Sequence, residues 1–272
     1  MYEFQTITAE KKGSILEVLF SRPEHRNPMN AKLYEEWASV LDSAEDDPEI
    51  RVVTVRGAGK VFSAGWDMKE IAPGYVKDGV STAHKMHEIP TLPRAWYFRK
   101  AIVAGVHEFV GAEALGFLGF CDFVIAAKGT RFSYEASRFG GDGNLFWILS
   151  LQLPMRVIKK MYMMGGWFDA DQALKWDFVQ RVVPLDQVEV ETNRWALELS
   201  KIPLQRTVAA KQNLHRIYEL MGLINFVAVG NQATVHSNNE QNIEFYRIVT
   251  ERGMREAVLY RDSQFDAALA KV

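Results

Sequence analysis

Apolar positions along the chain recur with two periods, and each period predicts a different kind of element. Short β-branched runs at 50–56, 101–106 and 122–127 predict buried strands. Apolar residues at helical spacing predict a helix from 31 to about 44, with Asn30 as its N-cap. Because helical patterns lie between the strands, we expect crossover connections and a largely parallel sheet. The patterning therefore predicts an α/β fold.

The two ends of the chain have different patterns. Residues 2–8 and 14–20 are expected to pair as a hairpin around the polar turn AEKKG. From about Leu185 onward the pattern is almost wholly helical, and it includes the apolar stretch LMGLINFVAV. We expect a core domain over residues 1–200. A helical C-terminal region over 201–272 is then expected to pack against this subunit or another.

The charge balance and the cysteine content exclude several classes of protein. The formal net charge is -2 and there is no basic run, so neither nucleic acid nor a membrane surface is expected as a partner. No basic segment followed by an apolar one marks a signal peptide at the N-terminus. The most apolar tract, 112–127, is too short to span a bilayer and contains Asp122. A single cysteine, Cys121, permits neither an internal disulfide nor a multi-cysteine metal site, so we expect a cytoplasmic protein without a metal.

One short stretch, VFSAGWDMKE at 61–70, carries the first candidate chemistry. Small residues and a glycine follow a predicted strand and precede a predicted helix start. Such a turn can expose the N–H group of Trp66, and an exposed N–H stabilises negative charge on a carbonyl oxygen. A glycine turn between a strand and a helix is also common in any α/β protein. A functional role therefore requires a second donor from another strand-to-helix turn.

Several segments of the chain resemble, in order, the motifs of the crotonase (enoyl-CoA hydratase/isomerase) superfamily. They extend over nearly the whole chain. The segments are FSRPEHRNPMNAKLYEEW (20–37), VFSAGWDMKE (61–70), KAIVAGVHEF (100–109), CDFVIAAKGTRF (121–132) and FDADQALKWDFVQRVVP (168–184).

This resemblance implies a fold and a class of substrate. The implied fold is ClpP/crotonase-like, with a spiral core of parallel β-sheet and a helical C-terminal region that joins subunits into a homotrimer, often paired as a hexamer. Members of the family bind acyl-CoA thioesters and stabilise an enolate-like state. No cofactor is implied other than the coenzyme A of the substrate itself.

The resemblance also implies roles for particular residues. Two backbone N–H groups would hold the thioester oxygen, the first from Trp66 and the second from Glu113 in GAEALGF. Coenzyme A would lie along the segment that includes Ala64, Asp67 and Met68. Arg26 would contact a CoA phosphate, although a solvated surface charge is an equally ordinary role for this arginine.

The sequence departs from the family pattern at both positions where hydratases carry a catalytic glutamate. Gly116 stands at the first position. The second glutamate is Glu135 if one residue is deleted, and without that deletion the position is occupied by Ala136. The stretch YEASRFGGDGNL resembles the hydroxycinnamoyl-CoA hydratase-lyases, which also lack the first glutamate, when Glu135 is aligned with their acid. A salt-bridging glutamate at a strand end is the alternative interpretation of Glu135.

Two further residues offer other chemistries. Asp142, in the turn GGDGN, could serve as a nucleophile or base, or simply favour a tight turn. His107 could be a general base, because its ordinary pKa is close to neutrality, or a hydrogen-bonded histidine at a strand end.

These candidates define one leading function and two alternatives. The leading function is hydration or hydratase-lyase chemistry on an α,β-unsaturated acyl-CoA, and the bulky ring of Trp66 favours a cyclic or aromatic acyl group. The first alternative is a hydrolase that cleaves a C–C bond of a β-dicarbonyl acyl-CoA with Asp142 or His107. The second is a catalytically degenerate member that binds CoA or acts as a scaffold.

Overall fold

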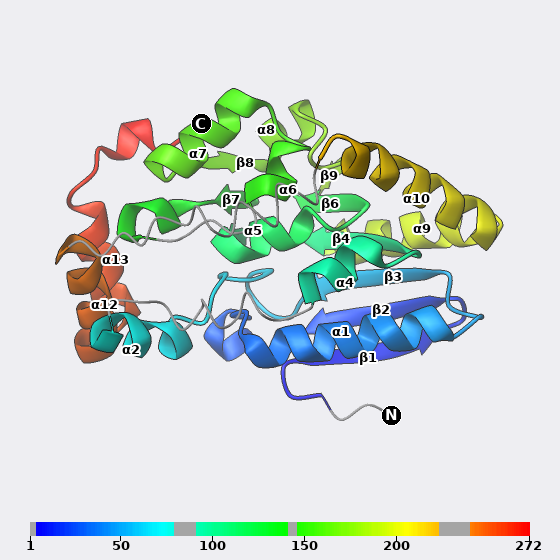
Figure 1. The fold of residues 1–272 in the computed structure, drawn as a ribbon, viewed down its shortest axis with the longest axis horizontal. Helices are drawn as coiled ribbons and strands as arrows, with labels where there is room; N and C mark the ends of the chain where they lie inside the picture. Colours follow the sequence, from blue (N-terminus) through cyan, green and yellow to red (C-terminus); the bar gives the residue numbers. More distant parts are fainter. Residues whose placement is uncertain (1–3, 79–90, 141–145, 223–239) are drawn as a thin grey trace.

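A six-stranded sheet forms the centre of the computed structural model, which describes residues 4–78, 91–140, 146–222 and 240–272 (Figure 1). The first two strands are antiparallel, and every other neighbouring pair is parallel. The mainly parallel α/β architecture predicted from the sequence is therefore confirmed. In spatial order the strands are β1 (Ile7–Lys12), β2 (Ile15–Phe20), β3 (Val52–Gly57), β4 (Ala101–Val106), β6 (Phe123–Ala127) and β9 (Arg181–Val183).

Both faces of this sheet are covered, which explains why its central strands are apolar at successive positions. On one face, Val53 and Val55 pack in a cluster with Trp37 of helix α1 (Ala31–Asp46). On the other face, Val52 packs in a cluster with Ala196 of helix α9 (Val188–Lys201). Helix α1 begins as predicted, because the Asn30 side chain accepts a hydrogen bond of 2.9 Å from the Leu33 N–H group.

A smaller sheet lies beside the first and leads into the helices near the site. Its order is β5 (Phe109–Gly111), β7 (Arg131–Ser133) and β8 (Trp167–Asp169), with β5 and β7 parallel. Helix α5 (Ala112–Leu118) follows β5 directly, and helix α2 (Met68–Asp78) follows the glycine turn. The other helices before the C-terminal region, and the short 3-10 turns of the described chain, are α4 (Thr91–Tyr97), α6 (Phe146–Ser150), α7 (Met155–Met164), α8 (Ala170–Lys175), η1 (Pro23–His25), η2 (Glu135–Phe139), η3 (Leu185–Gln187) and η4 (Ala267–Leu269).

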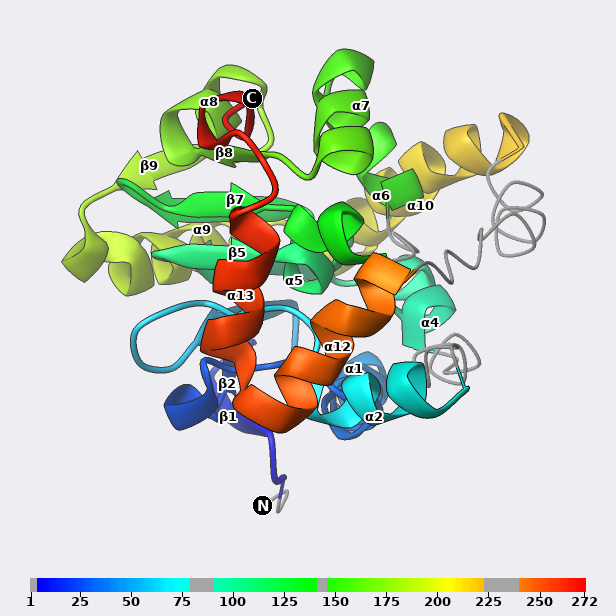
Figure 2. The same cartoon turned by 90° about the vertical axis from the view of Figure 1, so that its left-hand side faces the viewer.

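The C-terminal helices lie against the core of their own chain. Helix α12 (Glu240–Arg252) packs on α2, where Phe245 and Tyr246 form a buried cluster with Ala72. Figure 2 shows α12 and α13 (Met254–Asp262) in front of α2, β5 and β7, while α10 (Leu204–Leu220) lies at the far end in Figure 1. Within the described ranges, no helix combines the length and the hydrophobicity that a membrane crossing requires.

The N-terminal hairpin exists, but its predicted turn is wrong. The first strand is Ile7–Lys12 rather than 2–8, so most of AEKKG belongs to the strand, and the chain reverses at Gly13 with a φ of 61°. The first strand is an edge strand with polar, solvent-facing residues, and Lys11 forms ion pairs of 2.6 Å with Asp47 and Glu49. Polar residues therefore marked the outer edge of the sheet and not a turn.

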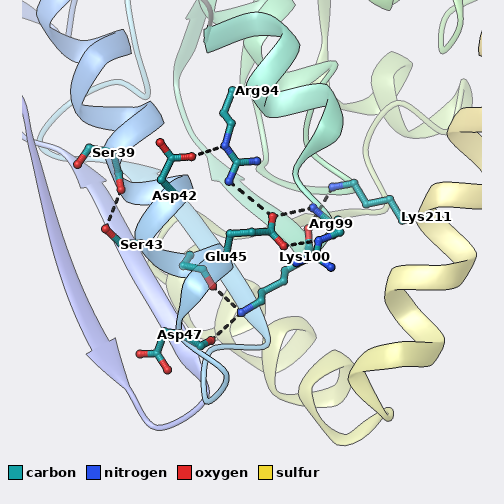
Figure 3. A network of polar contacts seen from close by, with 10 residues as sticks. Ser39, Asp42, Ser43, Glu45, Asp47, Arg94, Arg99, Lys100 and Lys211 are labelled. Carbon is teal, nitrogen blue, oxygen red and sulfur yellow. Dashed lines mark hydrogen bonds and ion pairs between the residues drawn. The ribbon is translucent and has the colours of Figure 1, made fainter.

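Polar contacts tie the C-terminal end of α1 to the start of β4 (Figure 3). The buried Lys100 ammonium donates to the main-chain oxygens of Ala44, at 2.5 Å, and Asp47, at 2.7 Å. On the other side, Lys211 of α10 donates to the Lys100 main-chain oxygen at 3.1 Å. The last carbonyl groups of a helix find no N–H donor within the helix. Lys100, which lies just before β4, supplies such a donor and therefore acts as a side-chain cap.

Candidate active site

Two segments of the chain run side by side and end at the same edge. The Gly111 N–H group donates to the Ser63 carbonyl oxygen at 3.0 Å, and the Ser63 N–H group donates to the Phe109 oxygen at 3.3 Å. Ser63 and Val110 form a parallel bridge. Both segments therefore continue in the same direction into their turns.

The two turns are in close contact because glycines stand where they meet. Gly65 has a φ of +88°, and a Cβ built on it would lie 3.0 Å from the Gly111 oxygen and 3.4 Å from the Glu113 nitrogen. A Cβ on Gly111 would lie only 2.3 Å from the Ala64 oxygen. The glycine expected in this turn is thus required by a left-handed backbone and by the close approach of a second chain segment.

The Trp66 N–H group points away from the neighbouring segment that contains Met29. Met29 donates to the Gly65 oxygen at 2.7 Å and accepts from the Asp67 N–H group at 2.8 Å. In a parallel bridge of this kind, the N–H of the residue between those two partners points to the opposite side. Among the described residues, the Trp66 N–H group has no hydrogen-bond acceptor.

Glu113 lies at the start of a helix and buries its side chain. It is the second residue of α5, so its N–H group belongs to the first helical turn, whose donors have no acceptor inside the helix. Its carboxylate accepts a hydrogen bond of 2.5 Å from the buried Tyr34 hydroxyl. Burial, with the Glu113 carboxylate beside it, raises the pKa of the Tyr34 hydroxyl well above its usual value. The Tyr34 ring also packs against the Trp66 ring, with 5.8 Å between centroids.

A cavity of about 730 Å³ opens beside these turns and contains most of the predicted site. Trp66 and Glu135 both line it, and so do all four residues predicted to contact coenzyme A. The lining of the cavity includes Arg22, His25, Arg26, Pro28, Ala64, Trp66, Asp67, Met68, Lys69, Phe109, Gly111, Ala112, Arg131, Ser133, Glu135, Ala136, Phe139, Tyr246, Met254, Arg255, Val258, Leu259, Arg261 and Asp262.

Asp67 has a structural role in the wall of the cavity. Its carboxylate forms an ion pair of 2.9 Å with Arg22 and accepts from the Lys69 N–H group at 3.2 Å, at the start of α2. A carboxylate at this place stabilises the helix N-terminus. Arg26, in contrast, has its guanidinium group 5.4 Å above the Phe109 ring and faces the cavity.

Glu135 lies at the end of β7, in the cavity wall, and forms ion pairs there. One carboxylate oxygen contacts the Arg131 guanidinium group, and the other is 2.9 Å from Arg261 of α13. Arg261 is only 7% exposed, so the second pair is largely shielded from solvent. Glu135 is thus salt-bridged, as one of its two interpretations expects, and it also lines the cavity, while its role as a catalytic acid stays a prediction. Ala136, the alternative at this position, lines the cavity without an acid group.

The structure does not bring His107 into this cavity. Its Nε2 atom lies 3.0 Å from the Gly59 main-chain oxygen, and its side chain is buried between loops. The chain turns sharply after it, at Glu108, which has a φ of 57°. Asp142 lies outside the described residues. Within the described part of the chain, no group of three His, Cys, Asp or Glu residues could hold a metal ion.

Several polar residues of the cavity were not found by sequence reasoning, and four of them bear directly on its chemistry. They are Arg22, Arg131, Ser133 and Arg261. Arg22 and Arg131 are within motifs that resemble the family, but neither has a spacing that indicates a partner. The pairing of Arg261 with Glu135 joins distant parts of the chain, so no local pattern could reveal it.

Comparison with known proteins gives the same assignment at three levels. The family model for enoyl-CoA hydratase/isomerase matches residues 10–265. Carnitinyl-CoA dehydratase of Escherichia coli K12 is 31% identical over 220 residues, covering 79% of this chain and 80% of that protein. The enzyme of the same name from Citrobacter koseri is 30% identical over 213 residues, covering 76% of this chain and 78% of that protein.

Solved structures agree with the fold of the whole chain. An enoyl-CoA hydratase/isomerase from Xanthobacter autotrophicus Py2 superposes with a TM-score of 0.88 at 24% identity, covering 97% of this chain and 100% of that one. An enoyl-CoA hydratase from Mycobacterium smegmatis gives 0.83 at 21% identity, covering 98% and 97%. The expected crotonase fold is therefore confirmed, and so is the expectation of a hydratase-like enzyme at that general level. The chain belongs to the enoyl-CoA hydratase/isomerase family of the crotonase superfamily.

Proposed function

We propose that this enzyme adds water to, or removes it from, the double bond of an α,β-unsaturated acyl-CoA. The observation that carries this proposal is the meeting of the Trp66 and Glu113 turns beside a cavity whose wall also holds Glu135. Hydration of an enoyl thioester needs a site for a negatively charged carbonyl oxygen and a group that handles protons. The cavity offers one candidate for each role.

The two backbone N–H groups would bind the thioester oxygen. Negative charge develops on this oxygen when water attacks the β-carbon. The electrons of the double bond then move toward the α-carbon and the carbonyl group, which forms an enolate. Donors that are already oriented toward the oxygen stabilise this charge without reorganisation. Removing one such donor costs about 2.7–4 kcal/mol of transition-state stabilisation.

Glu135 would serve as both base and acid. As the water oxygen bonds to the β-carbon, the carboxylate accepts a proton from that water. The protonated Glu135 then delivers the proton to the α-carbon, which restores the carboxylate and completes the addition of water. Two ion pairs, with Arg131 and Arg261, would hold the carboxylate in one position during this cycle.

Coenzyme A would enter along the basic part of the cavity. Arg26, His25 and Lys69 line this part, and cationic side chains suit the phosphates of the cofactor portion. Arg22 is already paired with Asp67, so Arg26 is the better phosphate ligand.

The acyl portion would be cyclic or aromatic, with elimination as a natural direction of the reaction. Near Glu135 the wall carries large apolar side chains, including Phe139, Tyr246, Val258 and Leu259. The related carnitinyl-CoA dehydratases support dehydration of a hydroxyacyl-CoA as the reaction type. Hydratase-lyase chemistry would use the same enolate. No observation on the described residues favours the hydrolase that would use His107.

A substrate panel tests the proposal. Linear, branched and aryl-substituted enoyl-CoA thioesters are incubated with the enzyme, and loss of their ultraviolet absorbance is followed, with product identity from mass spectrometry. We expect water addition to at least one of them. A ring-opened acid still attached to CoA would favour the hydrolase, and tight CoA binding without any reaction would favour a binding protein.

A substitution of the acid tests its role. Glu135→Gln should lower kcat by roughly 10²–10⁴-fold, the usual contribution of a general acid–base group. Glu191→Gln is the matched control, because Glu191 is also paired with an arginine, at 2.6 Å from Arg194, but on α9 across the sheet. Equal turnover in Glu135→Gln and the wild type would show that another group handles the proton.

A further inference from the structure

Ser133 is a buried hydroxyl in the cavity wall that has no partner among the described residues. It is the last residue of β7 and is 2% exposed, and its Oγ atom makes no hydrogen bond. Buried side-chain polar atoms are nearly always hydrogen-bonded, so an unpaired one at a cavity requires an explanation. A bound molecule that supplies the missing partner is such an explanation.

The direction of the Ser133 side chain follows from strand pairing. Ser133 pairs with Gly111 across the parallel strands β7 and β5, and paired residues point to the same face of a sheet. A Cβ on Gly111 would point at the Ala64 oxygen, in the turn that leads to Trp66. The hydroxyl of Ser133 therefore lies on the face where this turn and the cavity are.

The order of the segments at this edge places Ser133 beyond the carbonyl site. Segment 62–66 lies beside β5, and β5 lies beside β7. If the turns after segment 62–66 and after β5 hold the carbonyl oxygen, the acyl chain extends from there toward the end of β7. Ser133 and Glu135, two residues apart, stand there in the same cavity wall.

The other carboxylates of the cavity are occupied elsewhere. Asp67 binds Arg22 and the start of α2, and Asp262 binds Arg261 at 2.7 Å. Among the described residues that line the cavity, Glu135 would be the single carboxylate at the acyl end. A water held by one carboxylate alone can rotate, whereas buried waters typically make about three hydrogen bonds. A second fixed partner would orient its lone pair toward the β-carbon.

We propose that the Ser133 hydroxyl, together with Glu135, hydrogen-bonds the oxygen that is added to or leaves the β-carbon of the acyl group. This rests on the proposed hydratase function. During addition, one water proton passes to Glu135 and the other stays on the new hydroxyl group. Ser133 keeps its own proton throughout, so it binds and orients the oxygen and transfers nothing.

Two reactions of the same enzyme separate this role from a structural one. Hydration of an enoyl-CoA needs the β-oxygen, whereas exchange of an α-proton of a saturated acyl-CoA with deuterated solvent needs only the enolate and Glu135. Ser133→Ala should lower kcat for hydration by roughly tenfold, the loss expected for one hydrogen bond to the reacting water. It should leave the exchange rate and the melting temperature unchanged, because no folded-state hydrogen bond is removed.

Matched variants complete the test. Ser133→Thr keeps the hydroxyl and should recover most of the hydration rate. Ser137→Ala, which removes a neighbouring hydroxyl bonded to the Tyr162 oxygen outside the cavity lining, should hydrate at the wild-type rate.

Three outcomes would overturn the inference, and they differ from a failure of the proposed function. Wild-type hydration by Ser133→Ala would show that the hydroxyl does not hold the reacting oxygen. An equal loss of hydration and α-proton exchange would place Ser133 at the carbonyl oxygen or in the fold instead. A loss of hydration that Ser133→Thr does not recover would point to packing. If the wild type hydrates no enoyl-CoA, the proposed function itself is wrong, and the inference is wrong with it.

Discussion

At the scale of single residues, the site depends on which positions tolerate a side chain. The second turn of the site carries Ala112 and Glu113. Both residues are the first of helix α5 and neither has a positive φ. Glycine is therefore dispensable at positions 112 and 113, because the amide is directed by the start of a helix, whereas Gly111 just before them is required by the close approach of Ala64. The first turn differs, since Gly65 has a left-handed backbone in contact with the other segment.

Gly65→Ala should damage the site specifically. The left-handed conformation costs a non-glycine residue about 1–2 kcal/mol, and the new Cβ would meet the Gly111 oxygen at 3.0 Å. The turn must shift, and a displacement of reacting groups by about 1 Å can lower the rate by roughly 10²-fold. Steady-state hydration assays and thermal unfolding measure the two effects.

Gly13→Ala is the control for backbone strain alone. Gly13 also has a positive φ, 61°, but an added Cβ meets no atom within 4 Å, and it lies in the hairpin turn. It should lose a similar amount of stability and keep full activity. Equal activities for the Gly65 and Gly13 variants would contradict the role that we assign to the first turn.

At the scale of elements, contacts between the ends of helices and strands hold neighbouring elements together. The C-terminal end of α1 offers the clearest case, because its carbonyl groups are satisfied by Lys100 from the start of β4 (Figure 3). Glu45 in the last turn of α1 adds ion pairs to Arg94, at 3.6 Å, and Arg99, at 2.7 Å. The exposed ion pairs contribute little to the stability of the protein. The buried Lys100 ammonium contributes more, because it hydrogen-bonds two carbonyl oxygens that lose their water on folding.

Lys100→Met should destabilise the protein by about 1–3 kcal/mol, the usual cost of leaving buried polar groups without a partner. Methionine fills a similar volume, so the change reports mainly the lost hydrogen bonds. Urea unfolding followed by circular dichroism measures the free energy. Lys11→Met is the control, because Lys11 reaches the side chain of the same Asp47 at the surface, and its loss should matter much less. Equal urea midpoints for the two variants would show that the Lys100 cap stabilises the protein no more than the surface ion pair of Lys11 does.

At the scale of the whole molecule, helices far along the sequence complete the cavity. Met254, Val258 and Arg261 of α13 line it, and so does Tyr246 of α12. Helices α12 and α13 follow one another on one side of the molecule (Figure 2). One chain thus supplies the described cavity lining, including the partner of Glu135. The division into residues 1–200 and 201–272 remains a prediction about folding units, and the packing of α12 on α2 shows that the two parts share a buried cluster.

A homotrimer or hexamer remains our prediction for the assembly, and helix α10 offers a surface for it. Leu214, Ile217, Leu220 and Met221 recur at helical spacing and are 60%, 53%, 82% and 75% exposed in the single chain. Contiguous exposed apolar side chains often mark an interface between subunits. Light scattering after gel filtration should give the mass of three or six chains.

The double variant Ile217→Glu with Leu220→Glu should reduce this mass, because burying two carboxylates in an interface is unfavourable. Met163→Glu, at an equally exposed methionine of α7, provides the control and should leave the mass unchanged. A wild-type protein that elutes as a single chain would show that the assembly prediction is wrong.

Elements that rest on local rules could be predicted from the order of residues alone. The central strands, the helix capped by Asn30 and the glycine turn before Trp66 all follow from side-chain period, capping and backbone freedom within a few residues. The ordered motifs also determined the family, because they are spread over nearly the whole chain. The first strand was misplaced, since an edge strand and a turn can both be polar.

The contacts of individual side chains, in contrast, could be known only from the folded chain. It made Asp67 a helix cap bound to Arg22, kept His107 out of the cavity and set Glu135 between Arg131 and Arg261. It also left the Ser133 hydroxyl buried in the cavity wall, without a partner among the described residues. These outcomes depend on contacts between segments that are distant along the chain. Packing and strand register set such contacts, and no local pattern of residues specifies them.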